Sequence, residues 1–143
     1  MHPKSSNGQL PPARIARIIH AALIGCVTLC AALAWVAPGA PPAPDFPLRR
    51  LLGPAMAIGF VVAVYLRRWL PARQPDETAD AWWGVALPKA IAAWMLIEAT
   101  CLVGCVTLFL TGDPMALAWI AVGLLIFILM SPGRLRDSAR SVS

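Results

Sequence analysis

Charged side chains are scarce in this sequence. Aspartate, glutamate, lysine and arginine make up only 13% of its 143 residues, whereas 59% are hydrophobic. An average soluble domain is about 25% charged and about 45–50% apolar. A soluble chain of this length has too little interior volume to cover so much apolar surface. The shortage of charge therefore predicts a single domain that is embedded in lipid.

The residue sets that most enzymes use are also missing. The serines lie mostly in the two tails, no nucleophile–base set is visible, and no glycine-rich phosphate loop is present. We therefore expect neither an enzymatic activity nor a cofactor. The net charge of +5 could indicate nucleic acid, but the basic residues lie at the ends of apolar runs and aromatic residues are few. We expect no nucleic acid; anionic lipid headgroups near the basic loops are the expected partner.

The four cysteines, Cys26, Cys30, Cys101 and Cys105, all lie inside apolar segments. They do not form the framework of a secreted disulfide protein. Each i,i+4 pair could offer two metal ligands, but thiolates are costly in hydrocarbon and no histidine or aspartate completes either set. We interpret the cysteines as small buried hydrophobes and expect no metal site.

Four apolar segments predict an all-α integral membrane protein with four transmembrane helices, at about 18–37, 51–66, 90–110 and 115–130. The first and third reach the roughly 20 residues that cross a bilayer. The second and fourth are shorter and need snorkelling flanks or a thinned membrane. The predicted parts are a tail (1–13), a membrane domain (14–131) and a basic tail (132–143). A cleaved signal peptide is disfavoured because the first apolar segment is too long and a proline-rich stretch follows it.

The basic residues are distributed unevenly along the chain. Ten of the twelve lie in the N-terminal flank, in the loop 67–89 or in the C-terminal tail, and only Arg49 and Arg50 lie on the other side. The positive-inside rule then predicts a multi-pass membrane protein with both termini in the cytoplasm. In the middle loop we expect Trp82 and Trp83 at the membrane interface, on a short surface helix.

The five residues "GCVTL" occur twice, at 25–29 and at 104–108, an offset of 79 positions. This repetition indicates two helical hairpins in parallel repeat. A chance match within a restricted apolar alphabet is the alternative, and both interpretations stay open.

Small residues recur every third or fourth position within the apolar segments. Such stripes let membrane helices approach each other closely. We therefore predict helix packing through the following residues: Ala22, Cys26 and Cys30 in the first segment, Ala55, Gly59 and Ala63 in the second, and Cys101, Gly104 and Cys105 in the third.

Glu98 is the one acidic residue within the third segment, close to its middle. An intramembrane carboxyl group is costly and is by default a hypothesis of function, here a proton or ion site. The alternative is a structural acid that hydrogen-bonds another helix. His20 is the second ionisable candidate. Hydropathy places it roughly 9 Å shallower than Glu98, whereas the repeat places it at nearly equal depth. We prefer hydropathy and keep a Glu98–His20 pair as a hypothesis.

The sequence "RQPD" at 73–76, followed by "LIEATCLVGCVTLFL" at 96–110, resembles the hairpin of the rotor-ring c subunits of ATP synthases over about residues 51–111. The resemblance implies that Glu98 carries the proton and that Arg73, Gln74 and Pro75 form the loop that meets the stalk. Two further spans flank this hairpin. The whole-chain layout is similar to small uncharacterised four-span bacterial membrane proteins, a resemblance that implies the bacterial plasma (inner) membrane as location but no activity.

The function that these observations favour is that of a non-enzymatic membrane protein that packs with itself, as a homo-oligomer, or with a larger membrane complex. The alternative is proton or small-ion handling through Glu98.

Overall fold

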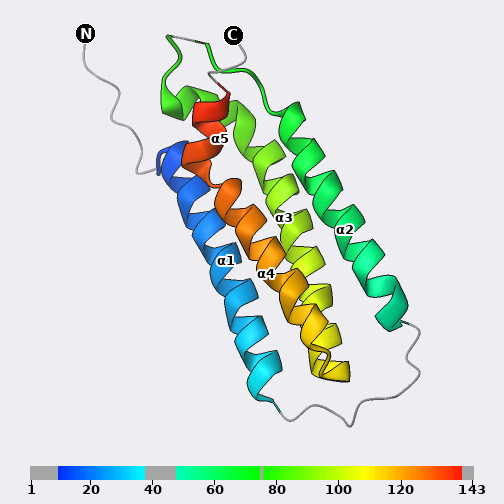
Figure 1. Ribbon diagram of the computed structural model, residues 1–143. Helices are drawn as coiled ribbons and strands as arrows, with labels where there is room; N and C mark the ends of the chain where they lie inside the picture. The colour runs from blue at the N-terminus through cyan, green and yellow to red at the C-terminus, as the bar shows by residue number, and fades with distance from the viewer. Residues whose placement is uncertain (1–9, 38–47, 75, 140–143) are drawn as a thin grey trace.

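The computed structural model describes residues 10–37, 48–74 and 76–139. These residues form α1 (Pro12–Val36), α2 (Leu48–Leu66), the short 3-10 helix η1 (Arg67–Trp69), α3 (Ala79–Thr111), α4 (Pro114–Leu129) and α5 (Pro132–Ser138), with no strand among them (Figure 1). Three helices, α1, α2 and α3, are long and apolar enough to cross a membrane, and α4 is an apolar helix of 16 residues. The prediction of an all-α fold is confirmed, and the helix lengths suit a membrane protein.

The helix α3 is the centre of the fold. It packs against α1, α2 and α4, and it carries more buried residues than any other described helix. α1 and α3 run in one direction, and α2 and α4 run in the other (Figure 1). The start of α1, the segment between α2 and α3, and α5 therefore meet at one end of the bundle, which we call the α5 end.

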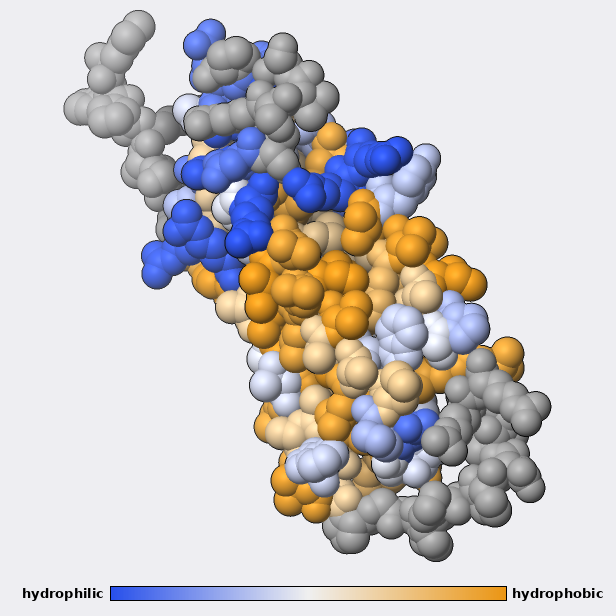
Figure 2. Space-filling view, in the orientation of Figure 1, coloured by the Kyte–Doolittle hydropathy of each residue, from blue (hydrophilic) through white to orange (hydrophobic). Residues whose placement is uncertain are grey.

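The surface agrees with a membrane-embedded chain. Hydrophobic side chains cover the length of the bundle, whereas hydrophilic residues gather towards the α5 end (Figure 2). Large apolar side chains such as Leu29, Leu33, Val61 and Val106 are each more than half exposed. A surface of this kind fits hydrocarbon as its solvent, because a water-soluble monomer rarely exposes so large an apolar area.

The predicted pair of repeated hairpins is only partly seen. The second hairpin is tight: Gly112 adopts a left-handed conformation with φ of 63°, and the Asp113 side chain accepts a hydrogen bond from the Met115 backbone N–H at 3.0 Å. Among the described residues, however, α1 and α2 do not pack as a hairpin, and they lie at opposite edges of the bundle (Figure 1). The reason is that both helices pack on α3 instead of on each other.

The two "GCVTL" copies also differ in depth. His20 faces Trp94 and Cys30 lies near Cys105, so facing residues of α1 and α3 are about 75 positions apart. The sequence repeat has an offset of 79. At 1.5 Å per residue, the copy in α3 therefore lies about 6 Å further along the bundle than the copy in α1.

The segment before the third predicted span differs from the prediction. Residues 79–89 do not form a separate surface helix; they are the first turns of α3, which continues through Pro88 to Thr111. Trp82 and Trp83 are 0% and 2% exposed, so the protein covers both side chains and neither offers a surface for contact with lipid headgroups. They are buried because the indole N–H of Trp82 donates to the Pro71 carbonyl at 3.0 Å and the two rings pack edge to face.

These tryptophans belong to a small structure that we call the head. It comprises η1, the segment 70–78, the first turns of α3 and the helix α5, whose Leu135 is fully buried. Arg73 joins two of its parts, because the Arg73 backbone N–H donates to the Ala139 carbonyl at 3.2 Å. The head covers the α5 end of the bundle.

Glycines allow the closest helix contacts. A Cβ atom at Gly59 of α2 would collide with Thr100 of α3, and one at Gly123 of α4 would collide with the Cys101 thiol. A Cβ atom at Gly104 would lie only 2.9 Å from the Met56 side chain. By contrast, the space around Gly25 is open. Backbone contact at these positions brings α2 and α4 close to α3.

We predict that Gly123→Ala destabilises the protein by about 1–3 kcal/mol, because an added methyl group overpacks this contact. The better helix propensity of alanine offsets only about 1 kcal/mol of that loss. Unfolding in detergent, followed by tryptophan fluorescence, measures the effect. Gly25→Ala is the matched control and should be neutral or stabilising; equal losses in the two variants would contradict the packing argument.

Candidate functional site

Glu98 lies on the side of α3 that faces α1. Its side chain is only 8% exposed. The Cys26 thiol of α1 lies within hydrogen-bonding reach of the Glu98 carboxyl group. Among the described residues, the ion pair recorded is the distant one between Arg136 and Asp137, so Glu98 has no cationic partner in this part of the chain. The site is therefore a buried acid beside a thiol.

The four cysteines gather around this acid. Cys105 lies close to Cys30 and Cys26, and Cys101 lies close to Glu98. All four are free thiols; Cys26 is exposed, Cys30 is half-buried, and Cys101 and Cys105 are buried. No group of three or more residues in the described ranges is arranged to hold a metal ion. The fold thus joins two cysteine pairs that are far apart in the sequence without making a metal site.

His20 does not share this site. Its Nε2 atom lies 2.9 Å from the Phe127 carbonyl oxygen of α4. Because a carbonyl oxygen only accepts, Nε2 must carry a hydrogen and donate it. The imidazole also packs edge to face against the rings of Trp94, at 5.0 Å, and Phe127, at 5.8 Å. His20 therefore connects α1 to α3 and α4.

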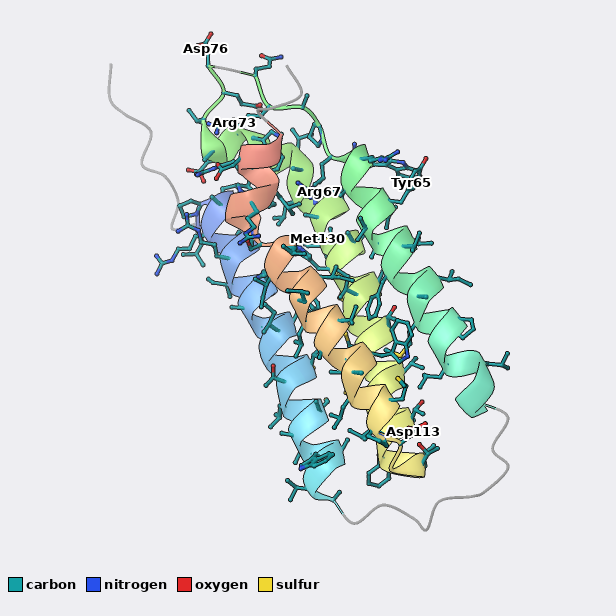
Figure 3. The ribbon with its side chains drawn as sticks, in the orientation of Figure 1. Tyr65, Arg67, Arg73, Asp76, Asp113 and Met130 are labelled. Carbon is teal, nitrogen blue, oxygen red and sulfur yellow. The ribbon has the colours of Figure 1, made fainter. Side chains whose placement is uncertain are left out.

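Trp94 makes a matching contact from α3. Its indole N–H donates to the Met130 carbonyl at 2.9 Å, just beyond the last residue of α4 (Figure 3). The last carbonyls of a helix have no partner within the helix itself. His20 and Trp94 thus supply two hydrogen bonds that the end of α4 lacks. Neither role was predicted, because each joins residues that are distant in the sequence.

The hypothesis of a Glu98–His20 pair is not supported by these contacts. Glu98 contacts the Cys26 thiol, whereas His20 is bonded to Phe127. His20 lies level with Trp94, four residues before Glu98, which is a difference in depth of about 6 Å. This value falls between the roughly 9 Å expected from hydropathy and the equal depth expected from the repeat.

The predicted packing residues divide into two groups. Ala22, Cys26 and Ala55 are exposed in the chain, because α1 turns Ala16, His20 and Val27 inward and α2 turns Met56 and Phe60 inward. These three side chains are not buried within the described chain, so helix packing through them stays a prediction. The others are half-buried or buried: Cys30, Gly59, Ala63, Cys101, Gly104 and Cys105.

The interface between α1 and α3 opens into a cavity at the end of the bundle remote from α5. This cavity measures about 240 Å³. Its lining comes from the end of α1 (Ala34, Trp35 and the C-cap Ala37) and from the end of α3 (Leu108 and the C-cap Gly112). Glu98 thus lies along an interface between α1 and α3 that has His20 on one side and a cavity on the other. Hydropathy contains no signal for such a cavity, because its lining joins residues that are about 70 or more positions apart in the sequence.

Comparison with known proteins adds no relative: no family model, no curated protein and no solved structure matches this chain. The resemblances to rotor-ring c subunits and to small four-span proteins therefore stay predictions.

We predict that His20→Phe destabilises the protein by about 1–3 kcal/mol, because the Phe127 carbonyl loses its donor while the aromatic volume is kept. Unfolding in detergent is again the measurement. Thr28→Val is the control, since the Thr28 hydroxyl is exposed and bonds only to the Ile24 carbonyl of its own helix. Combination with Glu98→Gln should be additive within about 0.5 kcal/mol. A larger coupling would restore the Glu98–His20 pair.

Proposed function

We propose that the protein is a non-enzymatic, four-span integral membrane protein that works by packing with other transmembrane helices, first of all with further copies of itself. The observation that carries this proposal is the outer face of α1. Ala22 and Gly25 lie on that face without cover from the described chain, and the exposed Cys26 lies at its edge, beside Glu98. Small residues on an exposed face are what a second membrane helix needs for close approach.

The burial of the helices supports the same conclusion. Only 11% of the most apolar stretch of α1 is buried, compared with 56% of that of α3. α3 therefore lies largely in the interior of the fold, whereas most side chains of α1 face outward. A Cβ atom or a neighbouring helix would meet nothing at Gly25. This is the place at which a further helix can be added without rearrangement of the bundle.

The proposed orientation places the α5 end in the cytoplasm of a bacterium, with the protein in the inner membrane. Support comes from the grouping of basic residues, since Arg14, Arg17, Arg67, Arg134 and Lys89 all belong to elements near this end. Anionic headgroups of the cytoplasmic leaflet attract such residues. The short length of α4 fits this orientation, because α5 and the rest of the head follow directly after the end of α4.

The assembly is tested by cross-linking in native membranes. A variant that keeps Cys26 and replaces the other three cysteines by alanine should form a disulfide-linked dimer on mild oxidation, because Cys26 is exposed. Gly25→Leu in that background should reduce the dimer about tenfold or more, since a bulky side chain blocks helix approach. Dimer yield on non-reducing gels is the measurement.

Two controls accompany this experiment. A variant that keeps only the buried Cys101 should stay monomeric, and Gly84→Leu, which also lies in open space but in the head, should leave the dimer unchanged. A chain that remains monomeric in lipid by sedimentation and yields no Cys26 dimer would contradict self-assembly.

A second candidate function is proton handling through Glu98, and one observation favours it. The carboxyl group is buried with a thiol neighbour and without a cation among the described residues. An intramembrane carboxyl group is by default a hypothesis of function in ion handling. A structural acid that holds α1 against α3 is the competing explanation for the same contact.

Proton flux into liposomes separates these explanations. If Glu98 carries protons, wild-type protein should pass them and Glu98→Gln should fall to the level of empty liposomes. Glu77→Gln, in the head, is the matched control and should behave as wild type. Absence of flux in every sample, with assembly unchanged, would exclude the ion-handling role. Loss of assembly alone in Glu98→Gln would identify a structural acid.

A further inference from the structure

Arg73 is an unusual residue of the head, because it is charged and almost completely buried. Its side chain is 7% exposed. The Nε and Nη2 atoms both donate to the Glu77 carbonyl, at 3.2 and 2.6 Å. Figure 3 shows Arg73 beside α5. Two donors and the backbone therefore fix the guanidinium group in one orientation.

The third nitrogen of the Arg73 guanidinium group, Nη1, makes no such hydrogen bond within the described chain. Nη1 is buried, and it has no hydrogen-bond partner among the described residues. A buried donor without an acceptor costs roughly 1–3 kcal/mol, and more when the donor is charged. The position thus requires an acceptor, and a negatively charged one would also compensate the buried positive charge.

The acidic residues of the head are engaged elsewhere or exposed. The Glu77 carboxylate accepts from the Gln74 backbone N–H, the Asp80 carboxylate accepts from the Ala13 backbone N–H, and Asp137 pairs with Arg136. Asp76 is exposed on the loop (Figure 3). None of these carboxylates is recorded as a partner of Arg73. The acceptor must therefore come from outside the described chain.

We propose that Arg73 binds an oxyanion of the phosphate class through Nη1, and that this ligand stabilises the head on the membrane bundle. A guanidinium group matches the oxygen spacing of phosphate better than an ammonium group does. The head lies just beyond the end of α2, where Trp69 and Tyr65 are exposed, as is common at the headgroup level of a membrane. The phosphate can thus belong to a phospholipid headgroup or to a soluble anion.

The test uses the full chain. Its unfolding midpoint is measured in neutral detergent with inorganic phosphate or with chloride at equal ionic strength, and in nanodiscs of phosphatidylglycerol or phosphatidylcholine. Trp82 and Trp83, which are buried in the head, contribute to the tryptophan fluorescence that follows unfolding. Stabilisation by phosphate over chloride assigns a soluble anion, whereas stabilisation only by phosphatidylglycerol assigns a lipid headgroup.

Arg73→Lys should weaken the effect of the active probe about tenfold or more, because the lysine keeps the charge but loses the fixed guanidinium geometry. Arg134→Lys, at an exposed arginine of α5, should respond as wild type. Equal responses of Arg73→Lys and wild type would overturn the proposal. If Arg73→Lys does not fold, saturable binding of one labelled phosphate or one phosphatidylglycerol to the wild-type chain decides the question. Absence of saturable binding of both probes overturns it.

Discussion

The end of α4 is the constraint on which the arrangement of the bundle depends. α4 has 16 residues, a length of about 24 Å, so it ends within reach of its neighbours and its last carbonyls cannot all find partners in the helix. His20 of α1 and Trp94 of α3 donate to the Phe127 and Met130 carbonyls. In hydrocarbon no water can replace these donors. Two hydrogen bonds therefore fix the relative heights of α1, α3 and α4, and those heights determine which residues face each other further along.

The position of Glu98 follows from that register. Because His20 is level with Trp94, the next turns of α1 bring Cys26 opposite Glu98 and Cys30 opposite Cys105. On the other sides of α3, close contact at Gly59 and Gly123 holds α2 and α4. The acid is thus enclosed by a thiol on α1 and by packed helices behind it. The proposed proton handling uses this contact between α1 and α3, whereas the proposed assembly uses the outer face of α1.

Hydropathy was sufficient to predict the helical class and the approximate positions of the apolar helices, because each of these depends on local composition. It failed where distant parts of the chain meet. Trp82 and Trp83 were expected to face the interface, yet both are buried, and Trp82 donates to the Pro71 carbonyl of the preceding segment. The partner of His20 lies 107 positions away, and no periodicity identifies it. Ala22 and Cys26 fit the spacing of a packing stripe, but spacing alone does not show which face of a helix turns inward.

The separation of α1 from α2 has a consequence for how the protein is made. Membrane helices enter the bilayer in chain order, and a neighbouring pair usually packs as soon as both have been inserted. Here α1 and α2 lie at opposite edges, and each depends on α3 for its main contacts (Figure 1). In the proposed membrane orientation, the first half of the chain therefore supplies two separate helices that do not pack as a hairpin. The tight α3–α4 hairpin is the unit on which both assemble, so the contacts of the fold are complete only when the second half of the chain is present.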